Sequence, residues 1–188
     1  MQDDGFKLYR RFLEGVERGF EELLALYTRG LLRFIYGYVN DFALAEDILQ
    51  ETFIALYFRR SFQPKENASF KTYLYQIARN KSLNALKKRK RKKEISLDSF
   101  VDPPAFLSYT LPETEEDKDR NALLRNALDK IKPEYREMLI LRYYDGLSPR
   151  QISAVTKKSI KRVYNLLARG KTALENALKK DGIRYEDL

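Results

Sequence analysis

Apolar residues recur every three or four positions along two long stretches of the chain, and this spacing is typical of helices that pack on one face. The first stretch runs from Phe6 to about Lys92, and two series show the spacing best: Phe20, Leu23, Leu24, Tyr27 and Leu31, then Ile48, Leu49, Thr52, Phe53 and Leu56. Breaks are expected at 38–42, where Asp41 can cap the next helix, and at 61–67, which contains Pro64. Residues 1–93 are therefore predicted to form a bundle of three or four helices.

The helical spacing disappears between residues 94 and 119, a segment with three prolines and a cluster of carboxylates: Pro103, Pro104, Pro112, Glu113, Glu115, Glu116 and Asp117. This composition predicts a flexible linker. Spacing resumes near Ala122, is interrupted at Lys132–Pro133 and continues to Asp145, after which Gly146 suits a helix C′ position. Residues 120–188 are predicted to form a second domain. The expected fold class is all-α: two small helical domains, an N-terminal bundle and a C-terminal helix-turn-helix, joined by a flexible linker.

Composition narrows the function classes. The 188 residues are 44% hydrophobic, enough for ordinary cores, and the net charge of +9 predicts a polyanionic partner. The chain has no Cys and no His, which excludes disulfides, thiolate metal sites and imidazole bases. The carboxylates show no spacing typical of an acid and base pair or a metal site. The chain is predicted not to be an enzyme, and no cofactor or small-molecule substrate is expected.

No apolar run approaches the length of about 20 residues that spans a bilayer. The N-terminal sequence MQDDGFKLYRR also lacks the apolar core of a signal peptide. A soluble cytoplasmic protein without a membrane span is expected.

The segment DGLSPRQISAVTKKSIKRVYNLLARGKTAL, residues 145–174, has the form of a helix-turn-helix. Ser148 is expected to cap the first helix, with Pro149 at its first position, and Ser159 is expected to cap the second. The predicted buried stripe of the second helix is Ile160, Val163, Tyr164 and Leu167.

The opposite face of this second helix is predicted to carry Lys161, Arg162, Asn165 and Arg169, with Lys157 and Lys158 in the preceding turn. Such a face suits the major groove, where Arg and Asn pair with base edges and Lys neutralises phosphates. Between Leu147 and Lys180 nine cations accompany a single carboxylate, Glu175. The alternative is an ordinary basic helical hairpin, since the turn lacks the Gly often found there.

One edge of the predicted helix 41–60 combines acidic, amide and apolar groups at steps of three or four residues: Asp47, Gln50, Glu51, Ile54 and Phe58. Such a mixed ridge suits a protein partner. The alternative is that Ile54 and Phe58 belong to the core and the carboxylates to a solvated face.

The helix expected from about Phe70 places a third set along one side: Tyr73, Ile77, Asn80, Asn84, Lys87 and Arg91. It ends in seven consecutive cations, Lys87 to Lys93, and the loop before it adds Phe62 and Phe70. Aromatic platforms beside a basic channel are typical of single-stranded nucleic-acid binding. The alternative is that the aromatics are core residues and the two asparagines are interior polar groups.

Two segments resemble a known family. ALAEDILQETFIALYFR followed by FKTYLYQIARNKSLNALKKRKR resembles the second conserved region of bacterial RNA polymerase sigma factors. LDKIKPEYREMLILRYYDGLSPRQIS with the helix-turn-helix resembles the fourth. With only these two regions and a linker, the chain is similar to the extracytoplasmic-function group over about Phe20 to Leu178.

The resemblance implies a role for each domain. Residues 1–93 would bind core RNA polymerase and the minus-ten element, and the helix-turn-helix in 120–188 would bind the minus-thirty-five element. The loop 61–70 with Asn80 would hold a base flipped from the non-template strand. An anti-sigma factor is a further expected partner. The alternatives are a helix-turn-helix regulator without polymerase contact, a sigma-like adaptor that does not initiate, and a membrane-surface protein that uses the basic run.

The resemblance also assigns residues to each partner. Contacts to the β′ clamp helices of core polymerase would come from Asp47, Gln50, Glu51 and Ile54. Contacts to the minus-ten element would come from Phe62, Phe70, Tyr73, Arg79, Asn80, Lys81, Asn84, Lys87 and Lys88. Contacts to the minus-thirty-five element would come from Arg150, Lys158, Ser159, Lys161, Arg162, Asn165 and Arg169.

The chain departs from the family pattern at five positions. Tyr73 stands where Trp is usual, Asn84 where Asp is common, Gln151 where Glu is usual, Ser153 where Ala is usual, and Leu166 where Arg often reaches DNA. Tyr73 and Asn84 keep the capacity to stack and to hydrogen-bond. Leu166 is expected to remove a cation from the reading face, so the upstream sequence preference cannot be copied from relatives.

Overall fold

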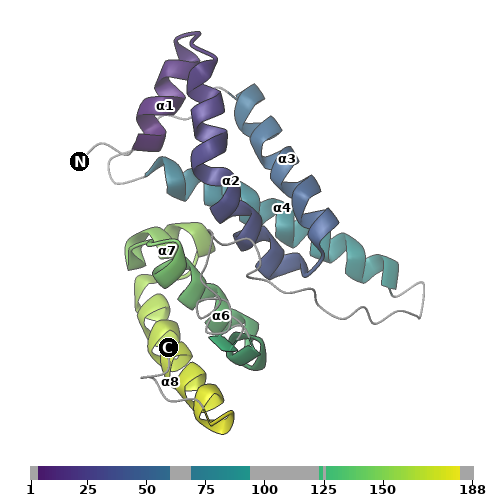
Figure 1. The fold of residues 1–188 in the computed structure, drawn as a ribbon, viewed down its shortest axis with the longest axis vertical. Coiled ribbons are helices and arrows are strands. Elements are labelled where there is room, and N and C mark those ends of the chain that lie inside the picture. The colour runs from purple at the N-terminus through teal and green to yellow at the C-terminus, as the bar shows by residue number, and fades with distance from the viewer. Residues whose placement is uncertain (1–3, 60–68, 94–122, 125, 183–188) are drawn as a thin grey trace. The chain divides into compact units, whose positions relative to one another are not determined.

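The computed structural model describes residues 4–59, 69–93, 123–124 and 126–182. Across these residues every regular element is a helix, which confirms the all-α prediction (Figure 1). Contacts divide the chain into two compact units. The first contains helices α1 to α4, and the second contains α6, η1, α8 and the first part of α7. The predicted linker, 94–119, lies outside the described residues.

The first unit is a bundle of four helices: α1 (Asp4–Leu13), α2 (Arg18–Val39), α3 (Phe42–Arg59) and α4 (Phe70–Lys93). Its core is rich in aromatic rings. Tyr9 of α1 lies 5.1 Å from the ring of Phe70, and Tyr27 of α2 lies 5.7 Å from the same ring. Tilted and edge-on pairs of this kind add to the burial of apolar area, so α1 is joined firmly to the bundle.

The turn between α1 and α2 was not expected from the spacing of apolar residues. Gly15 adopts φ +93 there, and the N–H of Val16 donates to the carbonyl of Arg11 at 3.0 Å. Gly15 tolerates this left-handed backbone because it has no Cβ. The apolar spacing continues across the turn, and it therefore concealed the boundary between two helices.

The turn between α2 and α3 falls where the sequence predicts it. Asn40 has φ 50, and its N–H donates to the carbonyl of Tyr36 at 2.9 Å. The carboxylate of Asp41 accepts a hydrogen bond from the N–H of Leu44 at 3.1 Å, which confirms the predicted cap. Arg89, one of the seven consecutive cations, reaches this turn with Nη1 3.5 Å from the carbonyl oxygen of Val39.

The second unit contains α6 (Pro133–Leu139), the π-helix η1 (Ile140–Tyr144), α7 (Pro149–Thr156) and α8 (Ile160–Lys180). Residues 123–124 and 126–130 are also helical. Pro133 occupies the first position of α6, where its missing N–H costs nothing. Gly146 follows the C-cap Asp145 with φ +65, as predicted for a C′ glycine.

The buried face of α8 differs from the predicted stripe. Val163 and Leu167 are buried, but Ile160 is 43% exposed and Tyr164 is 58% exposed. Leu166 and Gly170 complete the buried face instead. A Cβ at Gly170 would lie 3.3 Å from Cγ of Leu139, so α6 and α8 approach closely at the glycine. The side of α8 that faces α6 is therefore the one with Leu166 and Gly170.

No helix within the described ranges is both long enough and apolar enough to cross a membrane.

Candidate functional site

The first helix of the helix-turn-helix, α7, begins at a complete capping box. Ser148 Oγ accepts from the N–H of Gln151 at 3.3 Å, and the N–H of Ser148 donates to Oε1 of Gln151 at 2.8 Å. Pro149 takes the first helical position, so the predicted start is confirmed. Gln151, which stands where the family usually has Glu, supplies the acceptor that the box requires.

The turn between α7 and α8 is made without glycine. Lys157 adopts the left-handed conformation with φ 57, which costs a residue with a Cβ about 1–2 kcal/mol. The hydroxyl of Ser153 donates to the carbonyl of Lys158 at 2.6 Å and ties the turn to α7. Ser159 then caps α8 by accepting from the N–H of Arg162 at 3.3 Å, as predicted.

The outer face of α8 is exposed and cationic. The residues predicted to line it are all exposed: Lys161, Arg162, Asn165 and Arg169. Tyr164 and Ile160 are exposed as well and add an aromatic ring and an apolar group. Leu166 is only 7% exposed, so the expectation that it lies on the reading face is wrong.

One carboxylate of α6 reaches the start of α8. Oε1 of Glu134 lies 2.9 Å from Nζ of Lys158 and 3.1 Å from Nη2 of Arg162. The hydrogen bond from Lys158 lowers the pKa of the Glu134 carboxyl below its usual value. No pattern in the sequence predicts this contact, because Glu134 lies far from both cations along the chain.

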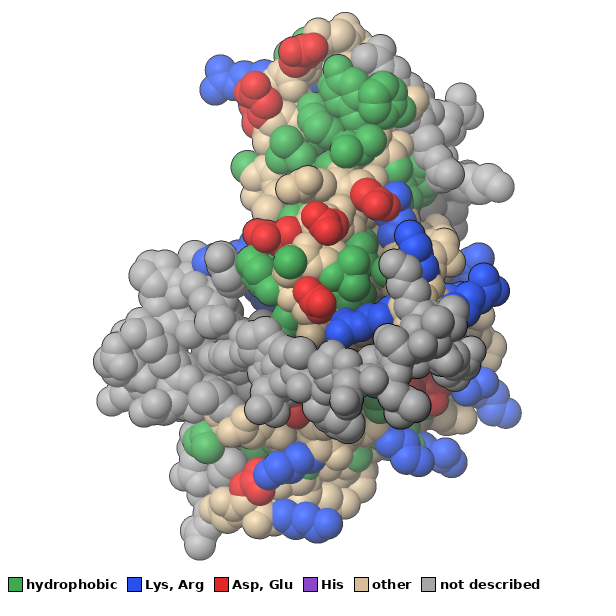
Figure 2. Space-filling view, turned by 90° about the vertical axis from the view of Figure 1, so that its right-hand side faces the viewer, with side chains coloured by type: hydrophobic (Ala, Val, Ile, Leu, Met, Phe, Trp, Pro, Cys, Tyr) green, Lys and Arg blue, Asp and Glu red, His purple; other side chains and the backbone are tan. Residues whose placement is uncertain are grey.

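The predicted protein-binding ridge on α3 is at the surface. Asp47, Gln50 and Glu51 are exposed, and Ile54 and Phe58 are 55% and 77% exposed. The alternative that Ile54 and Phe58 belong to the core is therefore excluded. Figure 2 views the side of the molecule on which α3 lies in Figure 1, and hydrophobic and acidic side chains adjoin there on the first unit.

The face of α4 that was predicted to meet single-stranded DNA is only partly exposed. Asn80 and Asn84 are exposed, which excludes the interior alternative for these amides, and Tyr73 is half-buried. Ile77 is only 8% exposed. Lys87, Lys88 and Arg91 continue the exposed part toward the C-terminus of the helix.

Phe70 does not belong to the predicted aromatic platform. Its side chain has no exposed surface, because it packs between Tyr9 and Tyr27 in the core of the bundle. The prediction that Phe70 stacks on a DNA base is therefore wrong for this structure. Phe62, the other loop aromatic, lies outside the described residues.

Two cations of α4 already have partners within the bundle. Arg79 Nε donates to the hydroxyl of Tyr38 at 3.1 Å, and Nζ of Lys81 lies 2.8 Å from the carboxylate of Glu51. Glu51 lies on the ridge of α3, so this ion pair links the predicted polymerase-binding and DNA-binding surfaces. Arg79 is half-buried, and its charge is held close to α2.

Comparison with known proteins identifies the family. Residues 23–92 match Sigma-70 region 2, and residues 121–174 match Sigma-70 region 4. The RNA polymerase sigma factor CarQ of Myxococcus xanthus is 30% identical over 148 residues, which are 77% of this chain and 80% of CarQ. The ECF RNA polymerase sigma factor SigM of Bacillus subtilis is 26% identical over 88% of this chain and 98% of SigM. The chain is an RNA polymerase sigma factor of the extracytoplasmic-function (ECF) group.

The similarity to known sigma factors extends over almost the whole of this sequence. RNA polymerase sigma-H factor of Pseudomonas aeruginosa is 28% identical over 95% of both chains. The fold is similar to that of CnrH, solved in complex with the cytosolic domain of CnrY, with a TM-score of 0.67 at 20% identity over 95% of this chain and 99% of CnrH. As a member of this family, the chain recognises promoters for RNA polymerase.

In this sigma factor, region 2 comprises most of α2 together with α3 and α4, and region 4 comprises α6 to α8 as far as Leu174. The outer face of α8 therefore belongs to region 4, and the ridge of α3 belongs to region 2.

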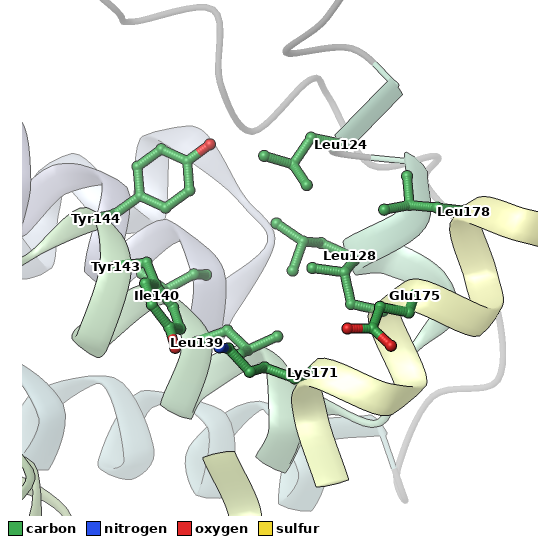
Figure 3. Close-up of a pocket in the computed structure, with 10 residues that line it drawn as sticks. Leu124, Leu128, Leu139, Ile140, Tyr143, Tyr144, Lys171, Glu175 and Leu178 are labelled. Carbon is green, nitrogen blue, oxygen red and sulfur yellow. The ribbon is translucent and has the colours of Figure 1, made fainter. Parts of the chain in front are cut away.

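The second unit also contains an apolar pocket of about 420 Å³ (Figure 3). Leucine and tyrosine side chains form most of its wall, with Lys171 and Glu175 contributed by α8: Leu124, Leu128, Leu139, Ile140, Tyr143, Tyr144, Lys171, Leu174, Glu175 and Leu178. Nζ of Lys171 lies 5.5 Å from the ring of Tyr143. In the parts of the chain that the structure describes, no group of three carboxylates comes together as a metal site would require.

Proposed function

We propose that the sigma factor divides promoter recognition between its two domains, residues 1–93 and 120–188. The first would bind core polymerase through the ridge of α3 and the minus-ten element through α4, and the second would bind the minus-thirty-five element through α8. The presence of regions 2 and 4 on one chain carries this proposal. Neither region alone could position two promoter elements relative to one polymerase.

The α8 surface suits duplex DNA. The first turn of α8 presents Lys161 and Arg162, and the next turns present Asn165 and Arg169. Arg and Asn can each form two hydrogen bonds with a base edge, while Lys contacts phosphates without reading sequence. Arg150 of α7 is exposed and would contact the phosphate backbone of the DNA. Each phosphate neutralised would lower log affinity by about 0.9 per tenfold rise in salt.

The α4 surface suits a melted strand. Unstacking a base costs a few kcal/mol, which a fitted pocket can recover by holding the flipped base. Asn80 offers an exposed amide, and Tyr73 offers a half-buried ring about two helical turns earlier. Phe70 is fully buried and would support this surface from beneath without touching DNA. Lys87 and Lys88 would contact phosphates.

The α3 ridge suits a protein. Exposed apolar side chains beside carboxylates form the kind of surface that helices of a larger protein bury. Ile54 and Phe58 would supply apolar contacts, and Asp47, Gln50 and Glu51 would supply polar contacts to the β′ clamp helices.

Replacing Asn80 by Ala is expected to change the minus-ten preference while leaving polymerase binding intact. The amide is exposed on α4 and would read the flipped base, so its loss should reduce discrimination at one position about tenfold. Transcription from a promoter library with core polymerase measures this. Asn176→Ala, which removes an exposed amide near the end of α8, is the control. An identical preference in both variants would count against the pocket.

Replacing Asp47 by Lys is expected to weaken binding to core polymerase about tenfold or more, because an ionic contact at the centre of an interface would be reversed. Glu17→Lys makes the same charge change on an exposed residue just before α2, outside the α3 ridge, and should alter affinity less than about threefold. Titration of labelled polymerase at fixed salt compares the two. Equal losses would show that net charge, and not the ridge, determines binding.

The same proposal places the sigma factor in the cytoplasm with RNA polymerase and assigns it no catalytic step. The structures of CnrH and of the sigma factor RpoE from Bartonella quintana contain CnrY and the anti-sigma factor NepR respectively. We propose that an anti-sigma factor also controls this chain. A rival function, a helix-turn-helix regulator without polymerase contact, would be favoured if the chain bound only duplex DNA and failed to bind polymerase.

A further inference from the structure

Three charged side chains meet at the start of α8. Oε1 of Glu134 contacts Nζ of Lys158 at 2.9 Å and Nη2 of Arg162 at 3.1 Å. Glu134 comes from α6, Lys158 from the turn and Arg162 from the first turn of α8. The carboxylate thus joins three parts of one domain at the point where a recognition helix enters the major groove.

The Lys158 side chain is poorly placed to contact phosphate. It is only 20% exposed, and its amine is held by Glu134. The Arg162 side chain is 61% exposed although it shares the same carboxylate. Lys158 therefore neutralises the carboxylate of Glu134 and holds it in place. The guanidinium of Arg162 remains exposed to solvent on the side away from Glu134. The sequence-based assignment of both cations to DNA contact does not distinguish these roles.

A guanidinium that is held in place by a carboxylate is better oriented to bind a base. An unrestrained Arg side chain loses considerable rotamer entropy when it binds, and a carboxylate that holds one nitrogen reduces that loss. The guanidinium has five N–H groups, and the pair with Glu134 uses Nη2. The remaining donors can form the bidentate contact that Arg makes with O6 and N7 of guanine.

We propose that Glu134 is a positioning residue that holds Arg162 to read a guanine in the upstream promoter element. The inference rests on the proposed function, because it assigns specificity within the contact between α8 and the minus-thirty-five element. It distinguishes Glu134 from a carboxylate that merely repels DNA, since repulsion would act on every sequence equally.

The test uses the full-length sigma factor with core polymerase and a promoter library randomised in the upstream element. In the Glu134→Gln variant, preference for guanine at one position should fall about tenfold, while the other positions keep their preferences. Arg162→Ala should abolish preference at that same position. The double variant should match Arg162→Ala, because Glu134 acts through the arginine.

Two further variants separate positioning from charge. Arg162→Lys keeps the cation but loses the planar fork that pairs with Glu134 and guanine together, so guanine preference should weaken while the salt dependence stays unchanged. Glu175→Gln removes one exposed carboxylate from the C-terminal half of α8 and should leave every preference unchanged. Circular dichroism of each variant verifies that the helices are retained.

The outcomes are distinct. If Glu134→Gln strengthens binding to all sequences equally, or leaves the guanine preference intact, the positioning role is overturned while the proposed function stands. If the unmodified sigma factor binds polymerase but selects no upstream base, the proposed role of α8 fails and the inference fails with it. Loss of preference at one position in both Glu134→Gln and Arg162→Ala supports the inference.

Discussion

Replacing Phe70 by Ala should lower the free energy of unfolding of the N-terminal bundle by about 3–5 kcal/mol. The Phe70 side chain has no exposed surface and packs against Tyr9 and Tyr27, which come from two other helices. Its truncation leaves a cavity that these rings cannot fill without leaving their own contacts. Typical domains are stable by only about 5–15 kcal/mol, so a large share of the stability would be lost.

Urea denaturation followed by circular dichroism measures this effect, since the chain has no Trp for fluorescence. Phe58→Ala is the matched control: Phe58 is 77% exposed, so the same substitution should cost less than about 1 kcal/mol. If Phe70→Ala left stability unchanged but weakened binding to single-stranded DNA, Phe70 would stack on a DNA base after all, and its assignment to the core would be wrong.

Replacing Gly19 by Val should destabilise the bundle by about 3 kcal/mol, because α1 must move away from α2. A Cβ at Gly19 would lie 2.6 Å from the carbonyl oxygen of Leu8 and 2.9 Å from the backbone nitrogen of Phe12. Backbone atoms cannot rotate out of the way as a side chain can. The movement would also disturb the burial of Tyr9, which is completely inside the core.

Hydrogen exchange of the α1 amides, together with urea denaturation, measures this second effect. Ala25→Val places the same side chain on the exposed face of α2 and should cost only about 0.5 kcal/mol, the difference in helix propensity. Val is no worse than Gly in helix propensity, so a loss of stability at Gly19 would reflect the clash with α1. A loss at Gly19 no larger than the loss at Ala25 would mean that α1 and α2 can separate freely.

Local signals in the sequence predicted the helix ends well. Asp41, Ser148 and Ser159 each accept the capping bond that was expected, and Gly146 takes the left-handed backbone after η1. A cap depends on residues within one turn of it, so the sequence nearby contains the necessary information. The break at Gly15 was missed because apolar spacing continues through it.

Helix faces were harder to predict than helix ends. The apolar spacing of α8 predicts a buried stripe that includes Ile160 and Tyr164, whereas the structure exposes both and buries Leu166. The choice depends on Gly170, which lets Leu139 of α6 approach that side. Such an approach is a property of two helices together and is absent from the pattern of either.

In the candidate site, too, local features were predicted and contacts between distant residues were not. Exposure of the α3 ridge, of Asn80 and of the cationic face of α8 agrees with the expected surfaces, while their partners remain predictions. Phe70 was misassigned because its ring partner Tyr9 belongs to a helix distant in sequence. Glu134 was missed for the same reason, since only the folded chain brings it to Arg162.

The ion pair between Glu51 and Lys81 gives the two faces of region 2 a shared group. If polymerase binds Glu51 as proposed, the amine of Lys81 would be released for a phosphate, and a phosphate bound to Lys81 would likewise release the carboxylate of Glu51. Because a thermodynamic cycle must close, each ligand then raises the affinity for the other by an equal factor. Solvent-exposed pairs contribute about 0–1 kcal/mol, so this cooperativity amounts to about fivefold at most, and added salt weakens it.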